Sequence, residues 1–297
     1  MIRHLSFAVL FLLFSMRAVT VVAADQPAEP EASSEVEIQV EKDIAYLGDD
    51  RAEKADLYLP LPHADGGRPG AIVVIHGGGW VGGDKAAARE RNIGPTLARH
   101  GYAALSINYR LAPKGERMAA WPGNLHDCKS AVRWLRENAD QYGFDATRVG
   151  VIGGSAGGHL AAMLGAAGPD AGLEPEGWPA EISSRVDAVV DLYGPTHVGL
   201  GPLGPDSDPA TSPITYLDAG DPPFLVIHGT ADTTVSVDRS KEFAEALASA
   251  GVKHELVIVE GAPHSFHLEP KQQDLRPIVL EFFDTHLRAD MTAGDPQ

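Results

Sequence analysis

The chain of 297 residues carries 41 acidic and 24 basic residues, and 44% of its residues are hydrophobic. This much apolar side chain favours one large folded core and excludes a disordered or fibrous chain. The formal net charge of −17 would repel phosphate backbones, so the composition also argues against a nucleic-acid-binding protein.

The first 24 residues have the pattern of a secretory signal peptide. A basic stretch at residues 3–4 is followed by an apolar run at residues 5–14, and small residues end at Ala24. Polar residues then interrupt the apolar run. The segment is therefore a poor candidate for a membrane span, which needs about 20 apolar residues. We expect cleavage after Ala24, which would delete two arginines and no acid, so that the formal charge changes from −17 to −19. The mature protein is then expected to be secreted or periplasmic and not attached to a membrane.

Three further segments follow from composition and patterning. Residues 25–35 are rich in Pro, Ala and Glu without periodicity, which predicts a mobile linker. We expect one globular domain over residues 36–290 and a disordered tail at residues 291–297. The domain opens with apolar residues that alternate with polar ones from Val36 and again from Ala55, on either side of a turn-like Gly-Asp-Asp, which predicts an antiparallel hairpin.

Six short, largely apolar segments come next, separated by helical stretches. Strands that are apolar on both faces are typical of a parallel sheet covered by helices. We therefore predict an α/β fold with a mostly parallel central sheet and helices on both faces. The strands are expected at residues 71–75, 103–107, 149–152, 186–192, 224–227 and 256–259. The helices between them are expected at residues 128–139, 155–166, 240–250 and 273–287.

The run Gly-Gly-Ser-Ala-Gly at residues 153–157 follows directly on a predicted strand and opens a predicted helix. In this context G-x-S-x-G forms a nucleophile elbow. The chain must turn from strand to helix within a residue or two, which leaves Ser155 in a strained conformation that small neighbours tolerate. A glycine-rich phosphate loop is the alternative, but the lysine of a Walker motif is missing. Ser155 is therefore the predicted nucleophile, with the N–H of Ala156 and the helix N-terminus facing any negative charge formed there.

The run His-Gly-Gly-Gly-Trp at residues 76–80 comes at the end of the first strand of the parallel sheet. Glycines at this place would let backbone N–H groups approach a substrate carbonyl oxygen. We predict that the N–H groups of Gly78, Gly79 and Ala156 form an oxyanion hole. A flexible loop without that role is the alternative.

An acid should follow the nucleophile on a loop after a later strand. Asp232 fits, because it comes directly after the strand predicted at residues 224–227. Asp221 precedes that strand, and Asp238 begins the next helix, where an N-cap role is expected instead.

The base is expected on the loop after the last strand, where His264 and His267 both stand. His267 would lie one turn further along if the loop continued as a helix. His264 is favoured, because the first position after the turn lies nearer to the sheet edge where Ser155 is expected.

Other candidate residues are expected to be structural. Cys128, the only cysteine, lies on an apolar helical stripe, which predicts a buried, inert thiol and no intramolecular disulfide. His159 follows Ser155 by four residues on the same helix and is expected to pack or cap. The remaining histidines show no metal-ligand spacing, so no metal site is predicted.

Four motifs now stand in order along the chain. They are His76-Gly77-Gly78-Gly79-Trp80, Gly153-Gly154-Ser155-Ala156-Gly157-Gly158, Asp232, and Gly261-x-x-His264-x-Phe266. Together they resemble the α/β-hydrolases related to hormone-sensitive lipase, and most closely the branch of bacterial acetyl-xylan and feruloyl esterases. The resemblance covers nearly all of residues 40–288 through further motifs: Gly83-Asp84-Lys85, Asn108-Tyr109-Arg110, Trp134-Leu135-Arg136 and Asp221-Pro222-Pro223-Phe224.

The resemblance implies the α/β-hydrolase fold, a catalytic triad of Ser155, Asp232 and His264, and no cofactor. Two departures from the family affect the expected shape of the site. The segment from Tyr193 to Ser212 is short and rich in Gly and Pro, and the N-terminal region lacks the helices that form a lid in relatives of hormone-sensitive lipase. We therefore expect a minimal cap rather than a deep, enclosed acyl pocket.

The sequence thus predicts a serine-dependent carboxylic ester hydrolase that works through an acyl-enzyme. The expected substrate is a short-chain or aromatic acyl ester, either a small molecule or a plant or algal polysaccharide. An amide-cleaving enzyme of the same fold, such as a peptidase or formamidase, is the alternative, because both reactions share one machinery. A non-catalytic binding domain on this fold is the alternative from another class, and the three intact triad residues argue against it. The oligomeric state does not follow from the sequence.

Overall fold

A computed structural model of the chain describes residues 37–61, 67–197 and 208–288. The predicted signal peptide, linker and C-terminal tail lie outside these described residues. So do residues 198–207, which make up much of the segment in which a minimal cap is predicted.

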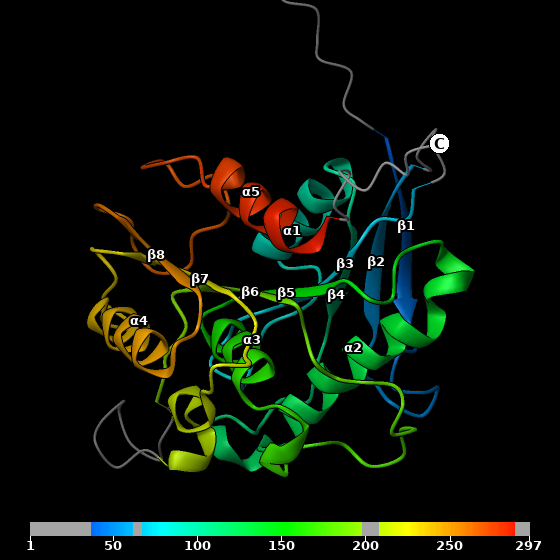
Figure 1. Ribbon diagram of the computed structural model, residues 1–297, viewed down its shortest axis with the longest axis horizontal. Coiled ribbons are helices and arrows are strands. Elements are labelled where there is room, and N and C mark those ends of the chain that lie inside the picture. The colour runs from blue at the N-terminus through cyan, green and yellow to red at the C-terminus, as the bar shows by residue number, and fades with distance from the viewer. Residues whose placement is uncertain (1–36, 62–66, 198–207, 289–297) are drawn as a thin grey trace, which may run out of the picture. The chain divides into compact units, whose positions relative to one another are not determined.

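The described chain folds around an eight-stranded sheet with the strand order β1-β2-β4-β3-β5-β6-β7-β8 (Figure 1). β2 pairs antiparallel with β1 and with β4, and the remaining neighbours pair parallel. The bounds are β1 Ile38–Ile44, β2 Ala55–Pro60, β3 Ala71–Ile75, β4 Ala103–Ile107, β5 Val149–Gly154, β6 Ala188–Leu192, β7 Phe224–Gly229 and β8 His254–Val259. The predicted opening hairpin and the mostly parallel sheet are both confirmed.

Helices cover both faces of the sheet, with α1 and α5 on one face and α2, α3 and α4 on the other (Figure 1). Their bounds are α1 Ala88–Arg99, α2 Gly123–Tyr142, α3 Ala156–Ala166, α4 Asp238–Ala250 and α5 Arg276–Leu287. Short 3₁₀ helices are η1 Arg117–Ala120, η2 Pro169–Ala171, η3 Pro209–Thr211 and η4 Pro213–Tyr216. Within the described ranges, none of the helices is both long and apolar enough to cross a membrane.

Helix α1 is the element that the sequence pattern does not predict. It contains Pro95, which lacks an N–H and normally ends a helix, and its buried apolar stripe is reduced to Ile93, Leu97 and Ala98. The helix forms nevertheless, because this stripe packs on the sheet face that it shares with α5.

The side chains buried around the sheet form two apolar clusters, one on each face. Leu160 of α3 belongs to the cluster that contains α2 and α4, and Phe283 of α5 belongs to the cluster that contains α1. Neighbouring strand residues alternate between the two, as Val73 and Val74 of β3 do. Both faces of the central strands are therefore buried, which is why β3 is wholly apolar and β5 and β7 are nearly so. Cys128 is fully buried in the first cluster, and burial raises the pKa of its thiol, which agrees with the predicted inert role.

The direction of the strands decides where the functional loops meet. Because β3, β5, β6, β7 and β8 run parallel, their carboxyl ends share one edge of the sheet. The loops that carry the predicted oxyanion hole, nucleophile, acid and base follow β3, β5, β7 and β8, so all four emerge at that edge.

Candidate active site

Ser155 lies in the sharp turn between β5 and α3. Its backbone has φ 58° and ψ −121°, a region that residues other than glycine rarely adopt. A methyl group on Gly153 would lie 2.2 Å from the carbonyl oxygen of Gly157, and one on Gly157 would lie 2.2 Å from that of Ile75. Only glycine therefore fits at these two positions, and the close approach of β5, α3 and β3 holds Ser155 in the strained conformation predicted for it.

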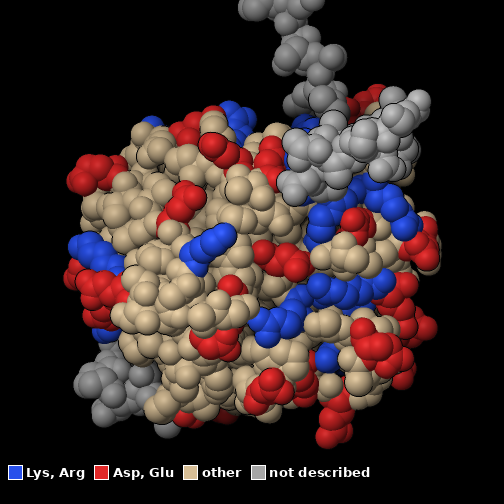
Figure 2. Space-filling view, viewed as in Figure 1, with Lys and Arg blue, Asp and Glu red and all other residues tan. Residues whose placement is uncertain are grey.

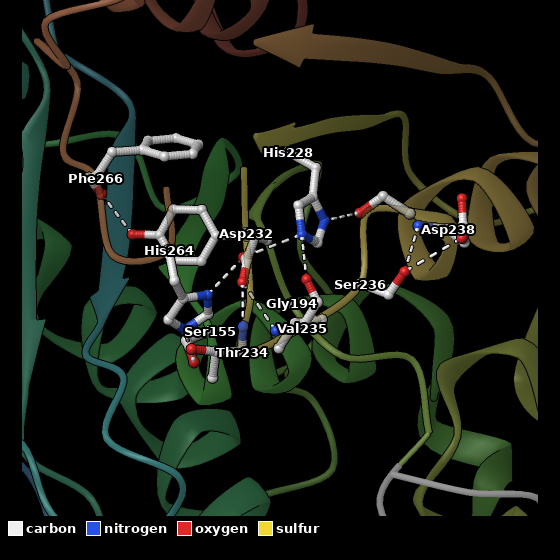
Figure 3. A network of polar contacts seen from close by, with 12 residues as sticks. Ser155, Gly194, His228, Asp232, Thr234, Val235, Ser236, Asp238, His264 and Phe266 are labelled. Carbon is white, nitrogen blue, oxygen red and sulfur yellow. Dashed lines mark hydrogen bonds and ion pairs between the residues drawn. The ribbon is translucent and has the colours of Figure 1, made fainter. Parts of the chain in front are cut away.

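Ser155, His264 and Asp232 form a chain of hydrogen bonds at the carboxyl edge of the sheet (Figure 3). Nε2 of His264 lies 2.9 Å from Oγ of Ser155, and Nδ1 lies 2.6 Å from Oδ2 of Asp232. A neutral His264 that donates from Nδ1 to the carboxylate leaves Nε2 free to accept from the serine hydroxyl. This is the tautomer that a general base needs, so the three residues predicted from the sequence are brought together in the order that acyl transfer requires.

His267 does not take the place of His264. Nδ1 of His267 accepts a hydrogen bond of 2.9 Å from the backbone N–H of Glu269, which closes a local turn away from the nucleophile. The choice of His264 over His267 as the base therefore agrees with the geometry.

The two rejected acids also lie elsewhere. Asp221 precedes β7 and lies away from the chain of Ser155, His264 and Asp232. The N-cap role expected for Asp238 is wrong, because the N-cap of α4 is Val237 and no side chain caps the helix. Asp238 is instead the first helical residue, and its carboxylate pairs with Nζ of Lys241 at 2.9 Å. Its negative charge in the first turn also interacts favourably with the positive end of the helix dipole.

The side chain of Asp232 is fully buried, and donors contact both of its carboxylate oxygens. Oδ1 accepts from the backbone N–H groups of Thr234 at 2.8 Å and Val235 at 2.9 Å, while Oδ2 faces His264. Burial opposes ionisation of this carboxyl, but the hydrogen bonds from His264, Val235 and Thr234 outweigh it and lower the pKa of Asp232. Asp232 is thus held as a carboxylate that can stabilise a protonated His264.

His228, the penultimate residue of β7, contacts the predicted acid and is not singled out by the sequence. Its Nε2 lies 3.1 Å from Oδ2 of Asp232 and 3.0 Å from the carbonyl oxygen of Val235 (Figure 3). A carbonyl oxygen can only accept, so Nε2 carries the proton, and Nδ1 accepts from the hydroxyl of Ser240 at 2.7 Å. Burial lowers the pKa of His228, which keeps the ring neutral in this arrangement. The signal in the sequence is a histidine at the end of an apolar strand, four residues before the acid.

Tyr193 connects the end of β6 to the loop that carries the base. Its hydroxyl donates to the carbonyl oxygen of Phe266 at 2.5 Å and accepts from Nη1 of Arg89 at 3.1 Å. The ring lies edge-on to His264, with 5.0 Å between the ring centroids. Tyr193 therefore fixes the position of the loop that carries His264 relative to the sheet, and so relative to Ser155 at the end of β5.

Gly78 and Gly79 lie in the loop after β3, with φ values of 117° and 62°. Neither backbone N–H has an acceptor among the residues that the structure describes. His76 fixes the start of this loop, because its Nδ1–H donates to the carbonyl oxygen of Gly77 at 2.7 Å and its ring stacks on Tyr109 at 4.3 Å. Two free N–H groups are thus held on a rigid loop, as an oxyanion hole requires.

A cavity of about 660 Å³ opens over the nucleophile. The predicted oxyanion-hole residues, the predicted nucleophile and the predicted base share its wall: Gly78, Gly79, Ala156, Ser155 and His264. A carbonyl group placed in this cavity can meet the serine oxygen and the free N–H groups together, so the geometry suits attack on an acyl carbon.

His159, on the helix that follows Ser155, is a packing residue. Nε2 of His159 donates to the carbonyl oxygen of Thr211 at 2.7 Å, and its ring packs edge-on against Trp80 at 5.2 Å. Burial lowers the pKa of His159 to about 4, so it is a neutral packing residue, as predicted. In the described ranges, no three His, Cys, Asp or Glu side chains gather closely enough to hold a metal ion.

Two family models match the chain. The model described as BD-FAE matches residues 55–202, and the model of the prolyl oligopeptidase family matches residues 192–290. Among curated proteins, Esterase LipC of Mycobacterium tuberculosis is 32% identical over 74% of this chain and 59% of its own length. Esterase LipQ of the same organism is 31% identical over 70% of this chain and 53% of its own length. The chain thus spans between half and three fifths of these curated relatives.

Two solved esterase structures match over nearly their whole length. A truncated carbohydrate esterase from gut microbiota has a TM-score of 0.72 and 26% identity, and the match covers 85% of this chain and 98% of that one. The apo form of Thermogutta terrifontis esterase 2 has a TM-score of 0.65 and 32% identity, and the match covers 85% of this chain and 93% of that one.

Proposed function

Because the chain belongs to the esterases of the α/β-hydrolase fold that resemble hormone-sensitive lipase, we propose that it hydrolyses carboxylic esters with Ser155 as nucleophile. The family and the fold that the sequence predicted are confirmed by these matches. The observation that carries the proposal is the unbroken hydrogen-bonded chain from Ser155 through His264 to Asp232, which opens into a cavity with free backbone N–H groups.

The proposed reaction begins when Oγ of Ser155 bonds to the ester carbonyl carbon while Nε2 of His264 takes the hydroxyl proton. The carbonyl electron pair moves to oxygen, and the N–H groups of Gly78, Gly79 and Ala156 donate to that oxyanion. When the electron pair returns, the bond to the alcohol oxygen breaks, and the alcohol leaves with the proton from His264. Water then attacks the acyl-enzyme and gives His264 a proton, which returns to Ser155 as the carboxylic acid is released.

Asp232 supports both halves of this cycle. In each half the ring of His264 carries a positive charge while the tetrahedral intermediate exists. The carboxylate of Asp232, ionised because its pKa is lowered, lies 2.6 Å from the ring nitrogen that does not react, and it stabilises that charge.

For the substrate, we propose a short-chain or aromatic acyl ester, with a small or polymeric alcohol. The match to the BD-FAE model and the likeness to a carbohydrate esterase from gut microbiota support a polysaccharide as one source of the alcohol. Amide cleavage is the second candidate, because the model of the prolyl oligopeptidase family matches the part of the chain that contains the acid and the base.

Labelling with a fluorophosphonate tests the nucleophile. Thermogutta terrifontis esterase 2, which is 34% identical, has been solved in a form phosphorylated by paraoxon. We expect the wild-type protein to gain one adduct by intact mass, Ser155→Ala to gain none, and Ser236→Ala, which removes a hydroxyl from the same cavity wall, to label like the wild type. Absence of labelling in the wild type would favour a non-catalytic binding domain.

A comparison of kcat/KM for p-nitrophenyl acetate and for p-nitroacetanilide then distinguishes ester from amide hydrolysis. We expect hydrolysis of the ester and at least about 10³-fold lower kcat/KM for the anilide. Comparable values for the two compounds would move the assignment to an amidase or peptidase.

The cellular location is a separate proposal. We propose that residues 1–24 direct export and are removed after Ala24, on the strength of their basic, apolar and small-residue segments. N-terminal sequencing of the protein from culture medium and periplasm would show Asp25 as the first residue, whereas a mature chain that keeps Met1 would contradict export by this route.

A further inference from the structure

The charged side chains that line the cavity over Ser155 have one sign. Apart from His264, the charged residues among its described lining are Arg89, Arg117 and Arg239, and no aspartate or glutamate joins them. The chain as a whole carries 41 acidic and 24 basic residues, so a basic lining departs from the overall composition. Figure 2 shows acidic and basic side chains interspersed over the face in view, as this composition leads one to expect.

Arg89 does not supply a free charge to the cavity. Its Nε donates to the buried carboxylate of Glu90 at 2.8 Å, and its Nη1 donates to the hydroxyl of Tyr193 at 3.1 Å. Its guanidinium also packs beneath Gly154, where a methyl group would lie 2.7 Å from Nη1. Arg89 is therefore a neutralised, packed residue that supports the floor of the site.

Arg117 and Arg239 are different, because much of their hydrogen-bonding capacity is unused. Arg117, the first residue of η1, is exposed and has no ion pair with any residue that the structure describes. Arg239, in the first turn of α4, has one ion pair, from Nη1 to Oε2 of Glu242 at 2.8 Å, and its side chain is 29% exposed. Both guanidinium groups can therefore donate to a ligand in the cavity.

The wall beside Arg239 also contains hydroxyl groups, of which that of Ser236 already donates to Oδ2 of Asp238 at 3.3 Å. Thr234 and Ser236 line the cavity between Asp232 and the start of α4, and each carries a hydroxyl group. Arginine presents a fork of N–H groups that matches a carboxylate in two parallel hydrogen bonds. A cavity of about 660 Å³ has room for such a group in addition to the acyl group that Ser155 attacks.

We propose that the ester cleaved at Ser155 carries a carboxylate a few bonds from the scissile carbonyl, and that Arg117 and Arg239 bind this carboxylate. This inference rests on the proposed esterase function and names the class of its substrate. The carboxylate can belong to the acyl part, as in a half-ester of a dicarboxylic acid, or to the alcohol part, as in an ester of an acidic sugar. Attraction between the carboxylate and these two solvent-accessible guanidinium groups strengthens binding and also speeds encounter.

Two pairs of substrates, matched in size, test the proposal and distinguish the two sources. On the alcohol side, 3-acetoxybenzoate is compared with 3-acetoxybenzamide. On the acyl side, the mono-4-nitrophenyl ester of adipic acid is compared with its terminal carboxamide. We expect kcat/KM to be about tenfold higher for the carboxylate in at least one pair, and this ratio to fall as NaCl rises from 0.02 to 0.5 M, because salt screens exposed charges.

The double variant Arg117→Gln and Arg239→Gln should bring that ratio close to one. Arg68→Gln is the matched control. Arg68 is 46% exposed, pairs with Asp140, and precedes β3 at the opposite edge of the sheet from Ser155, so the ratio should stay at its wild-type value.

The outcomes separate this inference from the function on which it rests. Hydrolysis of p-nitrophenyl acetate with a ratio of one or less in both pairs would overturn the anionic substrate and leave the esterase intact. A high ratio that persists in the double variant would overturn the assignment to these two arginines. Failure to hydrolyse any of the esters, p-nitrophenyl acetate included, would instead overturn the proposed function.

Discussion

Nε2 of His228 lies 3.1 Å from Oδ2 of Asp232, the same carboxylate oxygen that accepts from His264, the proposed base. The other oxygen, Oδ1, accepts two backbone N–H groups. Donors on both oxygens fix the rotation of the carboxylate, so the direction in which it faces His264 is set before substrate binds. His228 is therefore a positioning residue that acts through Asp232.

Replacement of His228 by leucine should lower kcat about tenfold and leave KM within about twofold, because a hydrogen bond to a charged group contributes about 1.5–3 kcal/mol. His228→Gln keeps an N–H donor of similar reach and should recover most of the loss. Steady-state kinetics and the Tm of both variants check this. Equal activity in the leucine and glutamine variants would show that His228 only packs.

The two histidines of the last loop should differ sharply in their effects. Ser155→Ala and His264→Ala are expected to lower kcat by roughly 10⁵–10⁶, as in other serine hydrolases, with folding retained. His267→Ala should keep kcat within about threefold, since His267 bonds only a local backbone N–H. If His267→Ala were the inactive variant and His264→Ala the active one, the base would be misassigned.

The rate should depend on pH through one ionisation. The base must be neutral to accept the serine proton, and histidine side chains ordinarily lose that proton at about pH 6–7. Because the pKa of Asp232 is lowered, this carboxylate stays ionised throughout that range. We expect kcat/KM for p-nitrophenyl acetate to rise from pH 5 to pH 7.5 and then level off. A flat profile across this range would exclude a histidine base.

Acid should destabilise the fold through His159. Burial lowers the pKa of His159 to about 4, while an unfolded histidine has a pKa of about 6.5. Between these values the unfolded chain binds the proton and the folded chain does not, so the free energy of unfolding falls as pH decreases from about 6.5 to 4.

His159→Gln keeps a donor for Thr211 and removes the titration. Urea unfolding at pH 7.5 and pH 5 should show that the wild type loses about 2 kcal/mol more than the variant, from roughly 1.4 kcal/mol for each pH unit below 6.5. The same loss in both proteins would mean that another group controls acid stability.

Acyl-chain length should favour short esters. The apolar side chains among the described lining of the cavity are few, with Trp80, Pro195 and Val235 the largest, so a long chain would leave methylenes in water. Each methylene group that stays in water loses about 0.8 kcal/mol of binding free energy relative to a buried one. We expect kcat/KM along a p-nitrophenyl series from acetate to palmitate to peak between acetyl and butyryl. A maximum at octanoate or beyond would reveal an acyl tunnel and indicate a lipase.

The sequence by itself determined the sheet, most of the helices and the three residues of the proposed triad. These features depend on local patterns: apolar runs that report burial on both faces, and a glycine-flanked serine between a strand and a helix. Strand direction then places the loops with Ser155, Asp232 and His264 at one edge, so their meeting follows from topology alone. Helix α1 was not predicted, because Pro95 disfavours a helix and the apolar stripe of this segment is short. The segment is helical because the stripe packs on the sheet.

Only the tertiary structure decided what surrounds the triad. Nothing in the local pattern of His228 shows that its ring reaches Asp232 and Ser240, and Tyr193 meets Phe266 across 73 positions of the chain. Arg117 and Arg239 likewise reach one cavity from separate elements. The periodicity of apolar residues indicates which face of a helix or strand is buried. It does not indicate which distant side chain a given residue contacts. The hydrogen bonds around the triad and the charge of the pocket depend on those contacts.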